Sequence, residues 1–142
     1  MVDILDAAHY IVLLSYGEKQ YSLTHLKLQK LLYFAQGWSC VWDGKLLFED
    51  EFEPWQYGPV NRKVFEAFRK YSRKEIPEEE GYDNITDLEA KATLDAIWSS
   101  FGDKPAHILT DIACDQKPWL EAHGNTKMIS NESIKDYFLE TY

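Results

Sequence analysis

Apolar residues recur at three- and four-residue steps over several stretches of the chain, and this periodicity predicts a mainly α protein. The clearest stretch follows Thr24, a residue type favoured at helix N-caps, and ends at Asp43-Gly44. The same pattern predicts further helices over 3–17, 59–71, 87–101, the stretch after Pro105 and the stretch after Ser130. We therefore expect a compact bundle of about six helices that forms a single domain over residues 1–142.

Helical periodicity is lost between Lys45 and Gly58. Three apolar residues, a run of acids and Phe52 are followed there by the sequence Pro54-Trp55-Gln56-Tyr57-Gly58-Pro59. Aromatic residues mixed with turn formers are typical of short strands, so we expect an extended or hairpin segment near residues 46–58. Pro59 suits the first turn of the helix that follows.

The segment 74–84 differs in composition from its neighbours. It contains Pro77, three consecutive glutamates and Gly81, with few apolar residues. We expect this segment to remain unpacked and to be the most mobile loop of the chain.

The composition indicates to which class of protein the chain belongs. Hydrophobic residues make up 45% of the 142 residues and aromatic residues 15%, which is enough for a core of its own. We find no apolar run long enough to cross a membrane, and because two acids stand among the first six residues we expect no secretory leader. The two cysteines, Cys40 and Cys114, lie far apart in apolar stretches and are typical of buried thiols, so we expect a cytoplasmic protein.

The net charge of −9 is unevenly distributed. Between residues 61 and 74 six bases face the single acid Glu66, which gives +5 locally and leaves −14 on the rest of the chain. Overall acidity opposes binding to phosphate backbones, so nucleic acid is an unlikely partner. The basic stretch is either a solvated face balanced by Glu75 and residues 78–80, or a site for an acidic protein or nucleic acid.

Few residues suggest a catalytic or metal-binding site. The four histidines are scattered and neither cysteine has a Cys-x-x-Cys partner, so we expect neither a metal nor a cofactor. His107, Asp111 and Cys114 step along one predicted helix and are the best catalytic candidates. Residues on one straight helix rarely form a triad, and Cys114 adjoins apolar neighbours. We therefore predict that the chain is not an enzyme.

The aromatic and proline-rich segment around Trp55 and Tyr57 allows two interpretations. Tyrosine and tryptophan are enriched at binding surfaces, where one end of the side chain is dry and the other can form hydrogen bonds. They are equally suited to covering a core. The residues alone leave these alternatives open.

Two motifs together resemble a known family. One is the run Leu26-Lys27-Leu28-Gln29-Lys30-Leu31-Leu32-Tyr33-Phe34-Ala35-Gln36-Gly37-Trp38, which is followed by Gly44-Lys45 and Leu47-Phe48, and the other is Glu53, Trp55, Tyr57-Gly58-Pro59-Val60. Together they closely resemble the Panacea antitoxin domain, also called SocA-like. The resemblance extends through Pro118-Trp119 to the C-terminal stretch and departs at His25, where the family leads us to expect asparagine. It implies a helical antitoxin that neutralises a cognate, usually genetically adjacent toxin by direct binding, often in phages or other mobile elements.

The resemblance also suggests where a partner binds. We hypothesise a recognition surface formed by Lys27, Lys30, Tyr33, Trp55, Tyr57, Gly58, Pro59 and Arg62. Charge reversal at Lys27 combined with Trp55→Ala should then weaken toxin binding without unfolding. Because one relative is an adaptor that delivers its toxin to a protease, a protease adaptor is an alternative function, as is a DNA-binding repressor.

Overall fold

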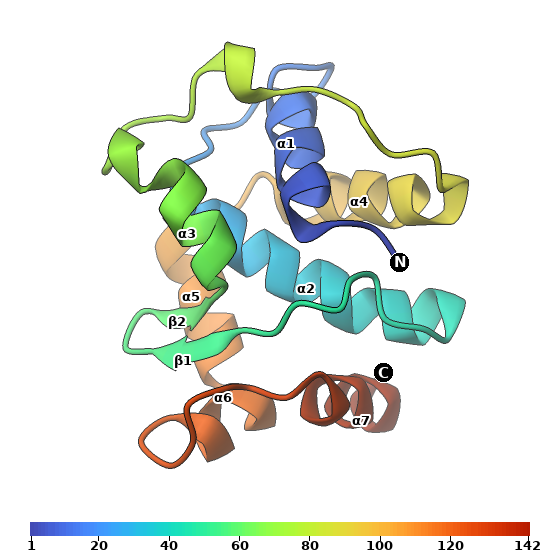
Figure 1. Cartoon of the computed structure of the whole chain (residues 1–142), viewed down its shortest axis with the longest axis vertical. Helices are drawn as coiled ribbons and strands as arrows, with labels where there is room; N and C mark the ends of the chain where they lie inside the picture. The colour runs from blue at the N-terminus through green and yellow to red at the C-terminus, as the bar shows by residue number, and fades with distance from the viewer.

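The longest helix, α2 (His25–Asp43), is the central element of the computed structural model, which describes residues 1–142. Fourteen of its 19 residues are buried. Lys27 and Lys30 are the only Lys, Arg, Asp or Glu residues from His25 to Trp42, and a helix with so few charges is typically surrounded on all sides. Figure 1 shows α2 crossing the middle of the molecule with helices above and below it.

The other helices enclose α2. On one side lie α1 (Ile4–Ser15) and α4 (Leu88–Phe101), and on the other α7 (Asn131–Thr141), with α3 (Arg62–Phe68) and α5 (Ala106–Cys114) completing the shell (Figure 1). The short helix α6 (Lys117–Ala122) connects α5 to α7. All seven α-helices contribute to one core of 30 buried hydrophobic residues. None of them combines the length and hydropathy that a membrane crossing requires.

The predicted fold class, mainly α with a small hairpin, is confirmed. Thr24 caps α2 by accepting a hydrogen bond from the Lys27 N–H, and Gly44 ends it with a left-handed φ of 70°. The structure has seven α-helices where we expected about six. The additional one, α6, has only six residues with Pro118 in its first turn, too short for periodicity to reveal.

The hairpin consists of β1 (Glu53–Trp55) and β2 (Gly58–Val60), which pair antiparallel. The expectation that Pro59 opens a helix is wrong, because Pro59 pairs with Pro54 within the hairpin. α3 begins instead at Arg62, and the Asn61 side chain caps it by accepting from the Val64 N–H at 3.1 Å. An N-cap residue has an extended backbone itself, as Asn61 does with φ −90° and ψ 128°, which places the helix start after the strand.

The segment after α3 contains two short 3-10 helices, η1 (Arg69–Tyr71) and η2 (Glu78–Glu80). The expectation that residues 74–84 remain unpacked is wrong. Ile76 is only 1% exposed and its N–H donates to the Leu23 carbonyl. Gly81 lies so close to α1 that a Cβ there would be 2.8 Å from the Leu13 backbone. One buried isoleucine and one close-packed glycine thus fix a segment whose composition is otherwise polar.

Candidate functional site

The tip of the β1–β2 hairpin presents side chains to solvent. Tyr57 is 62% exposed at the turn, Trp55 is half-buried, and Arg62 follows on the first turn of α3 with its side chain 59% exposed. All three are among the residues predicted to bind a partner. Arg62 lies over the Trp55 ring, and Tyr57 lies two residues after Trp55 in the turn of the same hairpin. We call Trp55, Tyr57 and Arg62 the hairpin surface.

An ion pair between Arg62 and Glu53, which we call the clamp, holds this surface in place. The guanidinium of Arg62 donates through Nε and Nη2 to the two carboxylate oxygens of Glu53, at 2.9 and 3.0 Å, and lies over the Trp55 ring at 5.5 Å. The Trp55 indole N–H also donates to Glu53, at 3.0 Å. Hydrogen bonding from Arg62 lowers the pKa of the Glu53 carboxyl, so the clamp stays ionised at neutral pH. A bidentate pair of this kind orders an otherwise flexible arginine.

Buried polar groups of α2 hold the hairpin from beneath. The amide of Gln29, fully buried, accepts from the Asn61 N–H at 2.8 Å and donates to the Asn61 carbonyl at 3.0 Å. The Lys30 ammonium donates to the Pro59 carbonyl at 3.4 Å. Gly58, with φ of 103°, rests on the Lys30 side chain, because a Cβ at this glycine would be 2.9 Å from Lys30 Cε.

Helix α6 supports the other edge of the hairpin. The Trp119 indole N–H donates to the Trp55 carbonyl at 2.8 Å, and the His123 ring Nδ1 lies 2.9 Å from the Pro54 carbonyl. The Trp119 and His123 rings stack with centroids 4.3 Å apart. With α2 beneath it and α3 beside it, the hairpin is held on three sides and presents its tip in a fixed orientation.

The other predicted binding residues are not on the surface. Lys27, Lys30 and Tyr33 are 5%, 0% and 0% exposed, and Gly58 and Pro59 are also buried. The expectation that the first three belong to a recognition surface is wrong, because α2 is enclosed on all sides. Charge reversal at Lys27 would therefore disrupt the interior, and it is unsuitable as a test of binding.

Lys27 and Tyr33 have structural roles in the interior. The Lys27 ammonium donates to the carbonyls of Ser22 and Gly102, at 2.7 and 2.5 Å, which ties the start of α2 to the end of α4. The Tyr33 hydroxyl donates to the Gln116 side chain at 2.7 Å, which joins α2 to the turn before α6. Both side chains hold together segments that are distant in sequence.

Lys30 is a buried cation without an ion-pair partner. Its single hydrogen bond, to the Pro59 carbonyl, is long at 3.4 Å. Burial lowers the pKa of Lys30 to about 8. The nearby His25 ring is also poorly satisfied, since its Nδ1 is buried with no hydrogen-bond partner, and burial followed by the Lys30 charge lowers the pKa of His25.

We expect Lys30→Met to stabilise the protein at neutral pH. The lysine pKa falls from 10.5 in the unfolded chain to about 8 in the fold, so the wild type loses stability as pH falls from 10.5 to 8 and stays at the lower level below 8. A shift of this size corresponds to about 3 kcal/mol at most. Urea unfolding at pH 7.0 and 9.5 measures the difference. The wild type should gain stability relative to Lys30→Met between the two pH values, and parallel behaviour of both proteins would contradict a depressed lysine.

The catalytic candidates do not form a prepared site. His107 and Asp111 are exposed, whereas Cys114 is half-buried beside the Gly58 backbone. Burial raises the pKa of the Cys114 thiol, which disfavours the thiolate needed for nucleophilic attack. No group of three or more histidine, cysteine or acidic side chains is placed to hold a metal ion.

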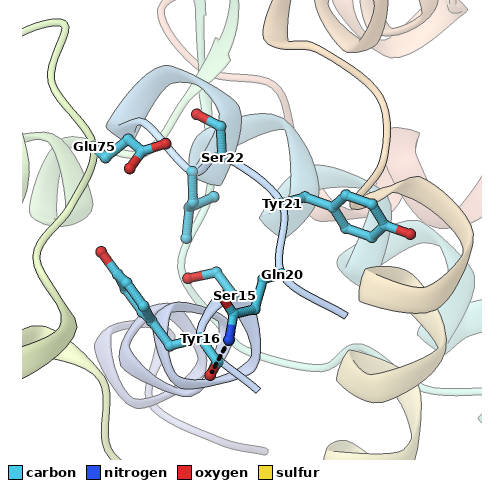
Figure 2. A pocket seen from close by; sticks show the side chains of 7 residues that line it. Ser15, Tyr16, Gln20, Tyr21, Ser22 and Glu75 are labelled. Atoms are coloured by element: carbon cyan, nitrogen blue, oxygen red, sulfur yellow. Dashed lines mark hydrogen bonds between the residues drawn. The ribbon is translucent and has the colours of Figure 1, made fainter. Parts of the chain in front are cut away.

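A polar cleft of about 190 Å³ lies between the end of α1, the following loop and Glu75 (Figure 2). Two of its hydroxyls are already used within the protein: Ser15 donates to the Val12 carbonyl and Tyr16 to the Ile76 carbonyl. Gln20 donates across the same region to the Tyr16 carbonyl, as Figure 2 shows. The side chains of Tyr21, Ser22 and Glu75 form no hydrogen bond, but all three residues are exposed, so the cleft has no buried polar group left free for a ligand.

Sequence reasoning missed three residues of the site. Glu53 belongs to the recognised motif but received no role, and Gln29 has no local sign that it binds Asn61 across 32 positions. Phe65 lies on a predicted helix, yet it is half-buried and meets the Trp55 ring edge-on at 4.9 Å. The acidic residue in the first strand, followed nine positions later by an arginine, is the only local signal for the clamp.

The fold and this site define a helical scaffold that displays a braced hairpin. The family model described as "Antitoxin SocA-like, Panacea domain" matches residues 28–120, which contain most of α2, the hairpin and α3 to α5. The chain belongs to this family, and the resemblance inferred from its motifs is confirmed.

One curated relative is Antitoxin SocA from Caulobacter vibrioides (strain NA1000 / CB15N). It is 43% identical over 54 residues, which are 38% of this chain and 29% of that protein. The match thus spans less than a third of the relative's own length. No solved structure matches the chain.

Proposed function

We propose that this chain is the antitoxin of a toxin–antitoxin system and that it neutralises a cognate protein toxin in the cytoplasm by direct binding. Family membership supports the antitoxin role. The observation that carries the binding mode is the hairpin surface, where Tyr57 is 62% exposed at the turn and Arg62 is held by Glu53 over the Trp55 ring. A large aromatic side chain held outward on a rigid support contributes contact area at low entropic cost.

Binding without chemistry is the simplest activity consistent with the site. The half-buried thiol of Cys114 has a raised pKa, and the hairpin surface contains an arginine and two aromatic residues but no nucleophile poised beside a base. Aromatic residues and arginine are the types enriched among residues that dominate protein–protein binding energy. On this proposal Lys30, Gly58 and Pro59 support the surface from within, whereas Lys27 and Tyr33 hold α2 to other segments.

The proposal is tested by identifying the partner. The tagged chain is purified from its native host, a protein recovered at equal stoichiometry is identified by mass spectrometry, and that protein is expressed with and without this chain. We expect it to arrest growth alone and to be harmless in the presence of the chain. If every co-purifying protein is harmless on its own, the antitoxin role is wrong, and DNA binding and protease delivery become the functions to test.

Tyr57→Ala should weaken toxin binding without changing stability. The side chain is mostly exposed and forms no hydrogen bond, so we expect the free energy of unfolding to change by less than about 0.5 kcal/mol. Loss of a central aromatic anchor should raise the dissociation constant about tenfold or more. Leu88→Ala is the control, since Leu88 is 76% exposed at the start of α4, far from the hairpin (Figure 1). Equal affinities for both variants would exclude Tyr57 from the interface.

A further inference from the structure

Arg62 has one occupied edge and one free edge. Its pairing with Glu53 uses Nε and one proton of Nη2, with hydrogen bonds of 2.9 and 3.0 Å. The Nη1 group and the remaining Nη2 proton form no hydrogen bond within the protein, and the side chain is 59% exposed. A guanidinium has five N–H donors in a fixed plane, so its free edge matches the two oxygens of a second carboxylate.

A second arginine extends the same surface. Trp55 meets Phe65 edge-on with centroids 4.9 Å apart, and the Arg69 guanidinium lies 5.7 Å from the centre of the Phe65 ring. Arg69 is seven residues after Arg62, about 10 Å further along a helical path. Its only ion pair, with Glu66, is long at 3.7 Å and exposed on both sides. Two cations thus flank two adjoining aromatic rings.

The charge of the surrounding stretch is only partly neutralised within the chain. Lys63 lies 3.3 Å from Asp50, and Lys70 lies 3.8 Å from Glu80. Arg73 and Lys74, by contrast, are exposed and form no ion pair. The positive charge without a close acid therefore follows one line in chain order, from the outer edge of Arg62 on α3 through Arg69 on η1 to residues 73–74 after η1, on a chain with a net charge of −9.

We infer that the partner segment bound at the hairpin surface is an acidic stretch of protein, with one carboxylate on the free edge of Arg62 and a second near Arg69. Its intervening apolar side chain packs against Trp55 and Tyr57. This inference rests on the proposed function and specifies the chemistry of the toxin surface that is recognised. Charge complementarity along the line increases the rate of association and fixes the register of the bound segment.

The same surface is poorly suited to nucleic acid. Glu53 lies beside Arg62, and Glu66 lies beside Arg69. A phosphate backbone bound along these arginines would therefore be repelled by the carboxylate next to each of them. The exposed acids of η2, Glu78 and Glu79, lie at the far end of the basic stretch. A short acidic peptide needs only the few cations that are free, whereas nucleic-acid binding requires a broader basic area.

The test uses the growth-arresting protein identified by co-purification. Tyr57→p-benzoylphenylalanine is introduced into the full chain, crosslinked to that protein by light, and the attached peptide is sequenced. In parallel, affinities are measured for Arg62→Glu, for Arg69→Glu and for the control Lys19→Glu, which makes the same charge change in the exposed loop between α1 and α2. Arg69→Glu removes the long pair with Glu66 and the contact with the Phe65 ring but breaks no side-chain hydrogen bond, so it keeps the test valid if Arg62→Glu fails to fold.

We expect a crosslinked peptide rich in aspartate and glutamate, a loss of affinity of about tenfold or more for Arg69→Glu, and a change of less than about twofold for Lys19→Glu. A peptide without acids, equal affinities for all variants, or crosslinks to a nucleic acid would each overturn the inference while neutralisation by the wild-type chain still stood. If the wild-type chain neutralises no co-purifying protein, the proposed function itself fails, and this result is distinct from the others.

Discussion

Gln36→Leu is expected to lower the stability of the protein severely. The Gln36 amide is fully buried on α2 and forms four hydrogen bonds. Its oxygen accepts from the N–H groups of Leu47 and Phe48, at 2.8 and 3.2 Å, and its nitrogen donates to the Phe48 carbonyl at 2.8 Å and to Asn131 at 3.1 Å. Leucine has a similar volume but satisfies none of these groups.

The expected cost follows from the backbone groups left without partners. Each buried unsatisfied donor or acceptor costs about 1–3 kcal/mol, and two N–H groups and a carbonyl are affected. We therefore expect a loss of about 3–5 kcal/mol, a large part of the stability of a domain of this size. Urea unfolding measures it, with Gln20→Leu as the matched control, since Gln20 is exposed and forms one 3.3 Å bond. Similar losses for both variants would show that the Gln36 network contributes little.

Gln36 illustrates a general feature of α2. Its polar side chains bind the backbone of the non-helical segment that follows: Ser39 donates to the Lys45 carbonyl, Gln36 holds residues 47–48, Lys30 reaches the Pro59 carbonyl and Gln29 holds Asn61. A segment without long strands has few ladder hydrogen bonds, and its buried backbone groups need other partners. Gln29, Lys30 and Gln36 of the recognised α2 motif are thus explained by support of the segment that contains the hairpin, whereas Lys27 and Tyr33 hold other parts of the chain to α2.

This feature also explains which parts of the fold could be predicted from sequence. Helix positions depend on local periodicity and caps, and Thr24, Gly44 and Ser130 marked their helix ends correctly. The burial of Lys27 and Lys30 depends on contacts across 29 to 75 positions, which periodicity does not encode. Lysine is ordinarily a surface residue, so its type favours a binding face at both positions and gives no sign of burial.

The candidate site was predictable only in part, for the same reason. Tyr57 and Arg62 are polar or amphipathic residues at a turn and at a helix start, and such positions are usually exposed, as they are here. Tryptophan is suited both to covering a core and to binding a partner. In the structure the Trp55 ring is half-buried, so part of it packs against the protein and part of it is exposed. It packs against Phe65 and lies beneath the exposed Arg62. The carboxylate that orders the arginine comes from the neighbouring strand, so its role required the hairpin register to be known.

Gly58→Ala is expected to disturb both stability and toxin binding. Gly58 adopts a φ of 103°, which costs any other residue about 1–3 kcal/mol. A Cβ there would also be 2.9 Å from Lys30 Cε and 3.7 Å from Cys114 Sγ, inside a buried contact where the lysine has little free space. Together these effects should lower the free energy of unfolding by about 2–4 kcal/mol. The turn that carries Tyr57 should move away from α2.

A substitution at Gly44 serves as the control that separates backbone strain from steric crowding in that experiment. Gly44 has a φ of 70° but nothing within 4 Å of its Cβ position, so Gly44→Ala should cost only about 1–2 kcal/mol and leave toxin affinity unchanged. Lys30→Ala should partly restore the stability of Gly58→Ala, because it removes the atom that the new methyl group meets, and a double-mutant cycle measures this coupling. Additive effects of the two changes would mean that Lys30 does not support the turn. A coupling accompanied by recovered toxin affinity would establish that the buried lysine and the glycine together set the orientation of the hairpin surface.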